Sequence, residues 1–237
     1  MDLGKAFTFI FEDDKWIVKI AIAAVLVFIP VIGWFPLGGW MLEISRRVAT
    51  GRQDVLPEWD DLGAYTIRGL KATVVVLIYY LPYILLSACV YSVPFLISGG
   101  QVSDNVEIGI IIVEVAVKCV TLVYFVFVTL IIPAALMRFT MNGDDIMAGL
   151  AFKEVIALVM NNIMAYVTIY LGYLVLTFLV PLGLIVVCVG ILFTIPYSVA
   201  VLGHLYGQTY TDNDANDDLL TGSAPPSAPA ASADWEG

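Results

Sequence analysis

The sequence predicts an all-α fold: a polytopic bundle of transmembrane helices, with about six membrane segments and amphipathic helices at the membrane interface. Composition is the first observation, because 60% of the 237 residues are hydrophobic and only 14% are charged. Soluble domains hold about 45–50% apolar and about 25% charged residues. The mean hydropathy, +0.92, is the second observation. Third, five basic and five acidic residues gather between Glu43 and Lys71, with long apolar runs on either side. Lipid can solvate such runs, whereas a soluble chain of this length could not bury them.

The apolar runs predict six membrane segments in one multi-pass domain, residues 1–210. In chain order the segments cover approximately residues 16–33, 37–50, 71–97, 108–137, 162–180 and 184–206. We expect a turn at 181–183 between the last two segments. Residues 211–237 hold six acidic residues, no basic one and a run of Pro, Ala and Ser. Such a stretch cannot bury apolar surface, so we expect a disordered tail.

Residues 3–11 predict an amphipathic helix in the membrane interface, because their apolar side chains recur at helical spacing on one face. Asp2 precedes this helix and can cap its first N–H groups. Segment 37–50 is short, since a helix of that length spans about 21 Å, less than the hydrocarbon core of about 30 Å. It is either a half-length return helix or a helix whose end reaches water at Arg46 and Arg47. We favour a tight hairpin with the preceding segment.

Charged residues mark the edges of several segments. Lys19, near the start of the first segment, is expected at the head-group level, where long cationic side chains extend toward water. Asp60 or Asp61 can cap a helix that begins near Leu62. The aspartate pairs at 13–14 and 144–145 also precede expected helices, and the alternative to capping is a cytoplasmic divalent-cation site.

Glu114 and Lys118 are four residues apart in an apolar run, the spacing of an ion pair on one helix face. An ionisable pair inside a membrane is a candidate functional site. Segment 108–137 is longer than one crossing, however, so the alternative places this pair at the outer interface.

The basic residues predict the topology. The N-terminus, the loops 46–71 and 138–161 and the tail are placed on one side, and that side then holds all basic residues except Lys118. Basic residues concentrate in cytoplasmic loops, so both termini are expected in the cytoplasm. The residues on that side are Lys5, Lys15, Lys19, Arg46, Arg47, Arg52, Arg68, Lys71, Arg138 and Lys153.

The N-terminal third carries a family resemblance. Asp13-Asp14-Lys15-Trp16 leads into a Pro-x-x-Gly turn, a Gly-Gly-Trp helix ending in Arg46-Arg47-Val48, the sequence Leu56-Pro57-Glu58-Trp59-Asp60, and Gly69-Leu70. This pattern resembles the uncharacterised prokaryotic multi-pass membrane family labelled domain of unknown function 4013. The resemblance covers most of residues 5–210 and is specific over 13–70. It implies a multi-pass fold in a bacterial or archaeal plasma membrane, and it brings no activity, substrate or catalytic residue.

Two stripes of hydroxyl side chains are the candidate functional residues. They are Tyr80, Tyr83, Ser87 and Tyr91 on the third segment, and Tyr166, Tyr170, Tyr173 and Thr177 on the fifth. Each set shares one helix face, and lipid offers these faces no hydrogen-bond partner. We expect the stripes to meet inside the bundle. They either form interhelical hydrogen bonds, worth about 0.6 kcal/mol each, or line a polar cavity for a lipid or small amphiphile between segments 3, 5 and 6.

No pattern in the sequence predicts an enzyme, a cofactor or a metal site. His204 is the single histidine, and the three cysteines lie in apolar runs without ligand spacing. No basic stripe predicts nucleic-acid binding. The expected partners are the bilayer and other membrane proteins or further copies of this chain. The sequence therefore favours a non-enzymatic protein that acts by packing, as a subunit or a membrane-organising protein. The alternative is a transporter-like or amphiphile-binding protein.

Overall fold

The computed structural model describes residues 1–97, 104–185 and 190–221, and over these residues the chain is helical without strands. The predicted all-α class is thus confirmed. The elements in order are α1 (Leu3–Thr8), the 3-10 helix η1 (Phe9–Glu12), α2 (Trp16–Val27), α3 (Trp34–Ala49), α4 (Leu62–Ile97), α5 (Asp104–Met141), α6 (Ile146–Gly149), α7 (Phe152–Asn161), α8 (Ile163–Ile185) and α9 (Gly190–Thr221).

Four helices in the described part of the chain are long and apolar enough to cross a membrane. The stretches are Leu62–Ala88 of α4, Ile111–Met141 of α5, Ile163–Pro181 of α8 and Gly190–Thr211 of α9. The predicted segments 16–33 and 37–50 correspond to α2, with 12 residues, and α3, with 16. Helices of these lengths span about 18 and about 24 Å, so neither alone reaches across a hydrocarbon core of about 30 Å.

The last two segments differ from the expected boundaries. Helix α8 continues through Pro181 to Ile185, so residues 181–183 do not form the expected turn and α9 begins only at Gly190. The reason is a close approach of the two helices, since a Cβ on Gly190 would lie 2.4 Å from the Gly183 carbonyl oxygen. The glycine contact, and not the proline, therefore accounts for where α8 and α9 approach each other.

Helix α9 also enters the stretch expected to be a disordered tail from residue 211. It ends at Thr221, and the residues from 211 to that point include no glycine or proline to stop a helix. Residues 222–237 lie outside the described part of the chain.

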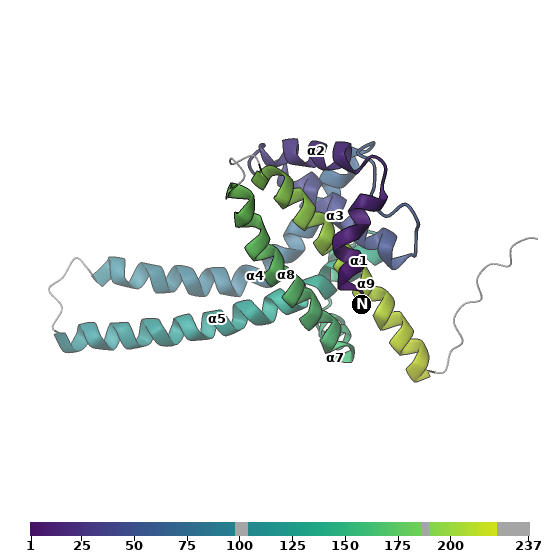
Figure 1. Ribbon diagram of the computed structural model, residues 1–237. Coiled ribbons are helices and arrows are strands. Elements are labelled where there is room, and N and C mark those ends of the chain that lie inside the picture. The colour runs from purple at the N-terminus through teal and green to yellow at the C-terminus, as the bar shows by residue number, and fades with distance from the viewer. Residues whose placement is uncertain (98–103, 186–189, 222–237) are drawn as a thin grey trace, which may run out of the picture.

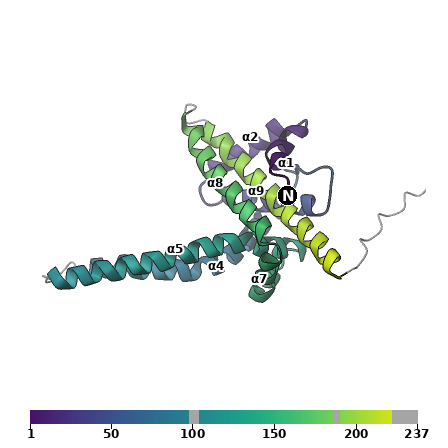
Figure 2. The ribbon, with the colours of Figure 1, turned by 60° about the horizontal axis from the view of Figure 1, so that its bottom comes forward.

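Helix α3 occupies the centre of the molecule. It packs mainly against α4 and α9, while α8 lies along α9 and α4 lies along α5. Figures 1 and 2 both show α4 and α5 side by side as a long hairpin that projects from the rest of the molecule. Trp40, Leu42 and Ile44 of α3 are buried. The hairpin instead presents large apolar side chains outward, such as Leu81 and Val123, and lipid can solvate this surface.

Glycines allow α3 to approach both neighbours closely. A Cβ on Gly69 of α4 would lie 1.8 Å from the Phe35 carbonyl oxygen, and a Cβ on Gly207 of α9 would lie 2.5 Å from that of Ser45. Neither position can accept a side chain without moving a backbone. Small residues at helix contacts are typical of membrane bundles, where close packing replaces the hydrophobic effect. The three-helix unit of α3, α4 and α9 is built on these contacts.

Candidate functional site

A buried carboxylate near the end of α3 organises a polar site that joins several elements. Glu43 accepts from Arg68 at Oε2 over 2.6 Å and from Arg47 at Oε1 over 3.0 Å, and Arg46 forms an ion pair with Oε2 over 2.6 Å. We call these four residues the Glu43 cluster. Arg46 and Arg47 follow Glu43 at the (i, i+3) and (i, i+4) spacings that place side chains on one face of α3. Arg68 arrives from α4.

Glu43 stays charged because its neighbours outweigh its burial. Burial in the protein raises the pKa of this carboxyl, but hydrogen bonds from Arg47 and Arg68 and the charge of Arg46 lower the pKa below its ordinary value of 4.5. A buried charge is tolerated only when it is paired and hydrogen-bonded in this way. The cluster is therefore an ion network at neutral pH.

The cluster extends to the turn after α5. Arg68 Nε donates to Asp144 Oδ2 over 2.8 Å, while its Nη1 donates to Glu43. Asp144 has a φ of 62°, in the left-handed region that aspartate tolerates better than most residues. One planar guanidinium thus joins α3, α4 and this turn, a role that suits the fixed fork of donors in arginine.

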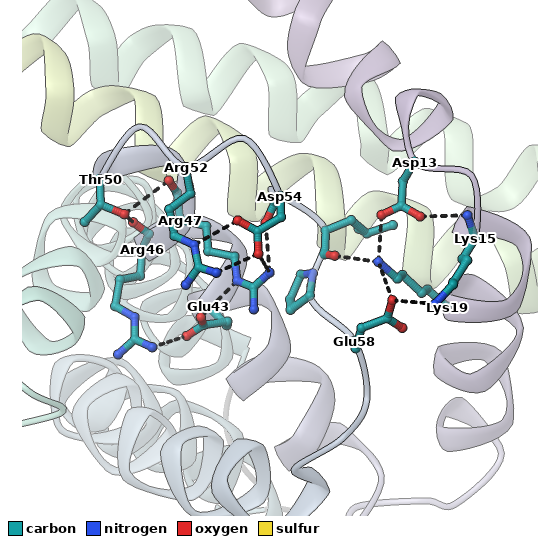
Figure 3. A network of polar contacts seen from close by, with 12 residues as sticks. Asp13, Lys15, Lys19, Glu43, Arg46, Arg47, Thr50, Arg52, Asp54 and Glu58 are labelled. Carbon is teal, nitrogen blue, oxygen red and sulfur yellow. Dashed lines mark hydrogen bonds and ion pairs between the residues drawn. The ribbon is translucent and has the colours of Figure 1, made fainter. Parts of the chain in front are cut away.

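The loop between α3 and α4 is held at both ends by ion pairs, as Figure 3 shows. Near its start, Arg47 and Arg52 both bind Asp54, over 2.9 and 2.6 Å. Near its end, Lys19 of α2 donates to the Leu56 carbonyl oxygen over 2.7 Å and pairs with Glu58 over 3.4 Å. The loop therefore has a defined conformation.

The head-group position of Lys19 stays a prediction, but its side chain does not extend freely toward water. Its side chain is buried, and its Nζ lies 2.6 Å from Asp13 Oδ2 in addition to its contacts with the loop. The physical reason is that the loop returns over α2 and supplies an acid and a carbonyl oxygen, which compete with water for the ammonium group.

Two tryptophans hold the α3–α4 loop against α2 and α3. Trp40 of α3 and Trp59 of the loop stack with ring centroids 5.1 Å apart. Trp40 Nε1 donates to the Pro57 carbonyl oxygen, and Trp59 Nε1 donates to that of Lys19. Both indole N–H groups are thereby satisfied inside the protein, which buried tryptophans require.

The hydroxyl stripes lie on the expected helices, but their closest partners differ from the expected ones. On α4, Tyr80 hydrogen-bonds Thr129 of α5 over 3.2 Å, and the Tyr83 ring packs on Phe125 of α5. Ser87 is half-buried nearby, and the side chain of Tyr91 lies outside the described residues. This stripe therefore faces α5, because α4 and α5 form a hairpin.

The second stripe runs from the interior to the surface of α8. Tyr166 is buried, Tyr170 is half-buried, and Tyr173 and Thr177 are exposed. Thr177 donates to the Tyr173 carbonyl oxygen of its own helix. A cavity between the stripes stays a prediction.

Other expected contacts are present. Lys118 and Glu114 form an ion pair over 2.6 Å. Asp61 accepts from the Ala64 N–H at the start of α4, and Asp145 accepts from the Met147 N–H at the start of α6. The described residues include no group of three side chains placed to hold a metal ion.

The buried charges of the Glu43 cluster were not expected from the sequence. The Glu-x-x-Arg-Arg spacing on α3 was a local signal for them, but the contribution of Arg68, 25 residues later, depends on the tertiary fold. Chemically, the arrangement holds elements together, since both oxygens of Glu43 already accept from guanidinium groups.

Comparison with known proteins gives one family match. The family model described as a protein of unknown function (DUF4013) matches residues 22–202. No curated protein and no solved structure matches the chain.

Proposed function

Because the chain belongs to the DUF4013 family of proteins of unknown function and carries four helices that can cross a membrane, we propose that it is a non-enzymatic integral membrane protein. It acts by packing, as a subunit of a membrane complex or as a membrane-organising protein. The bilayer and a further membrane protein or a second copy of the chain are its partners.

The observation that carries this proposal is the saturation of the buried charges. A catalytic acid or base needs a lone pair or proton within reach of a substrate. Glu43 instead binds three arginines, and Lys19 binds two acids and a carbonyl oxygen. These networks hold the α3–α4 loop in one conformation against the helices. A surface that binds another protein by packing benefits from such a fixed conformation.

The projecting hairpin of α4 and α5 supports the same proposal. Apolar side chains are exposed along both helices, for example Leu77 and Leu85 on α4 and Ile112 and Val120 on α5. Other membrane helices can pack against both sides of a projecting helix pair, whereas only the outer surface of a compact bundle is accessible to them. The hairpin is therefore the surface that we assign to partner contacts.

We further propose the plasma membrane as the location, with both termini in the cytoplasm. The N-terminus and the late part of α9 lie together, since Asp2 N donates to Gln208 Oε1 over 2.9 Å. Arg46, Arg47 and Arg52 gather around the α3–α4 loop, and basic residues concentrate on the cytoplasmic side.

Native mass spectrometry of the detergent-solubilised full chain tests the packing function. The expected result is a complex of defined mass with a second protein chain, either another copy or a different membrane protein. A monomer that carries one small molecule, and loses it in the double variant Tyr83→Phe and Tyr170→Phe, would instead establish the amphiphile-binding alternative.

A further inference from the structure

A polar cavity of about 380 Å³ lies between the N-terminal helices, the α3–α4 loop and α9. Its volume falls in the range of small-molecule sites, about 300–1,000 Å³. Its polar lining includes Lys5, Glu12, Arg52, His204 and Gln208. This cavity is separate from the tyrosine stripes.

His204 is the buried polar group of the cavity, and its neighbours fix its tautomer. Gln208 Oε1 accepts from the Asp2 N–H, so the other amide atom is the Nε2 donor. That nitrogen donates to the Asp2 carbonyl oxygen over 3.0 Å and lies 3.1 Å from His204 Nδ1. Nδ1 must therefore accept, and a neutral His204 carries its proton on Nε2.

The Nε2–H of His204 donates to no residue in the described part of the chain. The His204 ring is 3% exposed and packs on Phe9 with centroids 4.5 Å apart. Within the described part of the chain, the hydrogen bonds of His204 involve Nδ1 alone. A ligand oxygen in the cavity can accept from this Nε2–H, and such a hydrogen bond would stabilise the bound ligand.

The charges of the cavity then select the ligand. Asp54 is neutralised by Arg47 and Arg52, and Asp13 by Lys19. The cation and the anion of the lining that form no ion pair with any described residue are Lys5 and Glu12. One free positive and one free negative charge match a ligand that carries both signs.

We propose that this cavity binds a zwitterionic head group that carries a phosphate and an ammonium group. His204 Nε2–H and Lys5 hold the phosphate oxygens, because a lysine ammonium is a compact point charge that suits phosphate. Glu12 holds the ammonium. The exposed apolar side chains of Leu3 and Phe11 on the same N-terminal helices place the site beside lipid. The ligand is a phosphoethanolamine group, either on a lipid or free in solution.

Binding of three probes to the full-length protein in detergent tests the proposal: short-chain phosphatidylethanolamine, short-chain phosphatidylglycerol and phosphoethanolamine. The ethanolamine lipid is expected to bind at least about tenfold more tightly than the glycerol lipid, which lacks the ammonium. Equal binding of phosphoethanolamine would identify a soluble ligand, and binding of the lipid alone would identify a lipid; both results support the site.

Variants of the exposed residues Lys5 and Glu12 keep the main test free of folding effects. Lys5→Gln is expected to weaken ethanolamine-lipid binding about tenfold, and Glu12→Gln to remove the preference over the glycerol lipid. Lys153→Gln on α7 is the matched control and should change neither. His204→Phe, which keeps a ring beside Phe9, should act like Lys5→Gln. Equal or tighter binding of the glycerol lipid, or equal effects of Lys5→Gln and Lys153→Gln, would overturn the proposal.

Discussion

Arg68 of α4 lies 2.6 Å from Glu43 of α3 and 2.8 Å from Asp144 in the turn after α5. A single side chain therefore ties together three parts of the chain that are far apart in sequence. Replacing a whole buried ion network by apolar groups can be neutral, but removing one partner leaves an uncompensated charge. The network thus makes this region sensitive to single substitutions.

Substitution of Arg68 by lysine should destabilise the protein although it keeps the charge. A lysine ammonium lacks the planar fork that reaches Glu43 and Asp144 together, so one carboxylate loses its partner. Breaking a buried pair costs about 3–5 kcal/mol at the upper end. Thermal unfolding in detergent should show a clearly lower midpoint, whereas Arg52→Lys, in an exposed ion pair, should leave the midpoint unchanged. Equal midpoints for the two variants would contradict the role of Arg68.

Glu43 should make stability depend on pH. Its pKa is lower in the folded than in the unfolded protein, where the ordinary value is 4.5. Its contribution is therefore fully present above about pH 4.5 and is lost as the pH falls through the folded pKa. Unfolding midpoints measured from pH 7 to pH 3 should fall below pH 4.5 in the natural protein. The same fall should be smaller in Glu43→Gln, and an identical pH profile would rule out this carboxyl as the cause.

Trp59→Leu should loosen the loop between α3 and α4. The variant removes the stack on Trp40 and the hydrogen bond to the Lys19 carbonyl oxygen. Aromatic pairs contribute about 0.5–1.5 kcal/mol beyond the area that they bury. Limited proteolysis with trypsin should cut faster at Arg52, which lies in this loop. Trp34→Leu replaces a mostly exposed tryptophan and serves as the control, for which no faster cleavage is expected.

Cysteine labelling from outside whole cells tests the proposed topology. With Cys89, Cys119 and Cys188 replaced by serine, the variant Asp60→Cys should not react with an impermeant reagent, and Gln101→Cys should react. Asp60 is exposed, so access does not limit its reaction. The opposite pattern would place the α3–α4 loop outside the cell and reverse the topology.

The sequence predicts the helices better than their partners. Apolar runs and breakers identify the long helices, and Asp61 correctly marks the start of α4 near Leu62. The end of α8 could not be placed in the same way. Pro181 is a strong local signal for a turn, but the close contact of Gly183 with Gly190 is a tertiary feature that overrides it.

In the candidate site, too, the sequence predicts the helices but not the contacts between them. The tyrosine stripe on α4 follows from helical spacing, but spacing does not identify the facing helix, and Tyr80 bonds α5 rather than α8. Likewise, the position of Lys19 at the start of an apolar run does not predict that its side chain is buried in the protein. The loop that buries it returns from 37 residues further along the chain. Such contacts depend on how loops fold back, which local sequence does not encode.

Helix α3 lies at the centre of the fold, in direct backbone contact with α4. Thermal unfolding of Gly69→Ala beside Gly63→Ala, both on α4, measures how much the protein depends on this contact. A Cβ at Gly69 would lie 1.8 Å from the Phe35 carbonyl oxygen, but a Cβ at Gly63 would lie 3.5 Å from its nearest neighbour, an Asp61 side-chain oxygen. We predict a strongly lowered midpoint for Gly69→Ala and an unchanged or raised midpoint for Gly63→Ala, since alanine favours a helix by about 0.4–1 kcal/mol where it fits. Equal or higher stability of Gly69→Ala would contradict the packing of α3 against α4.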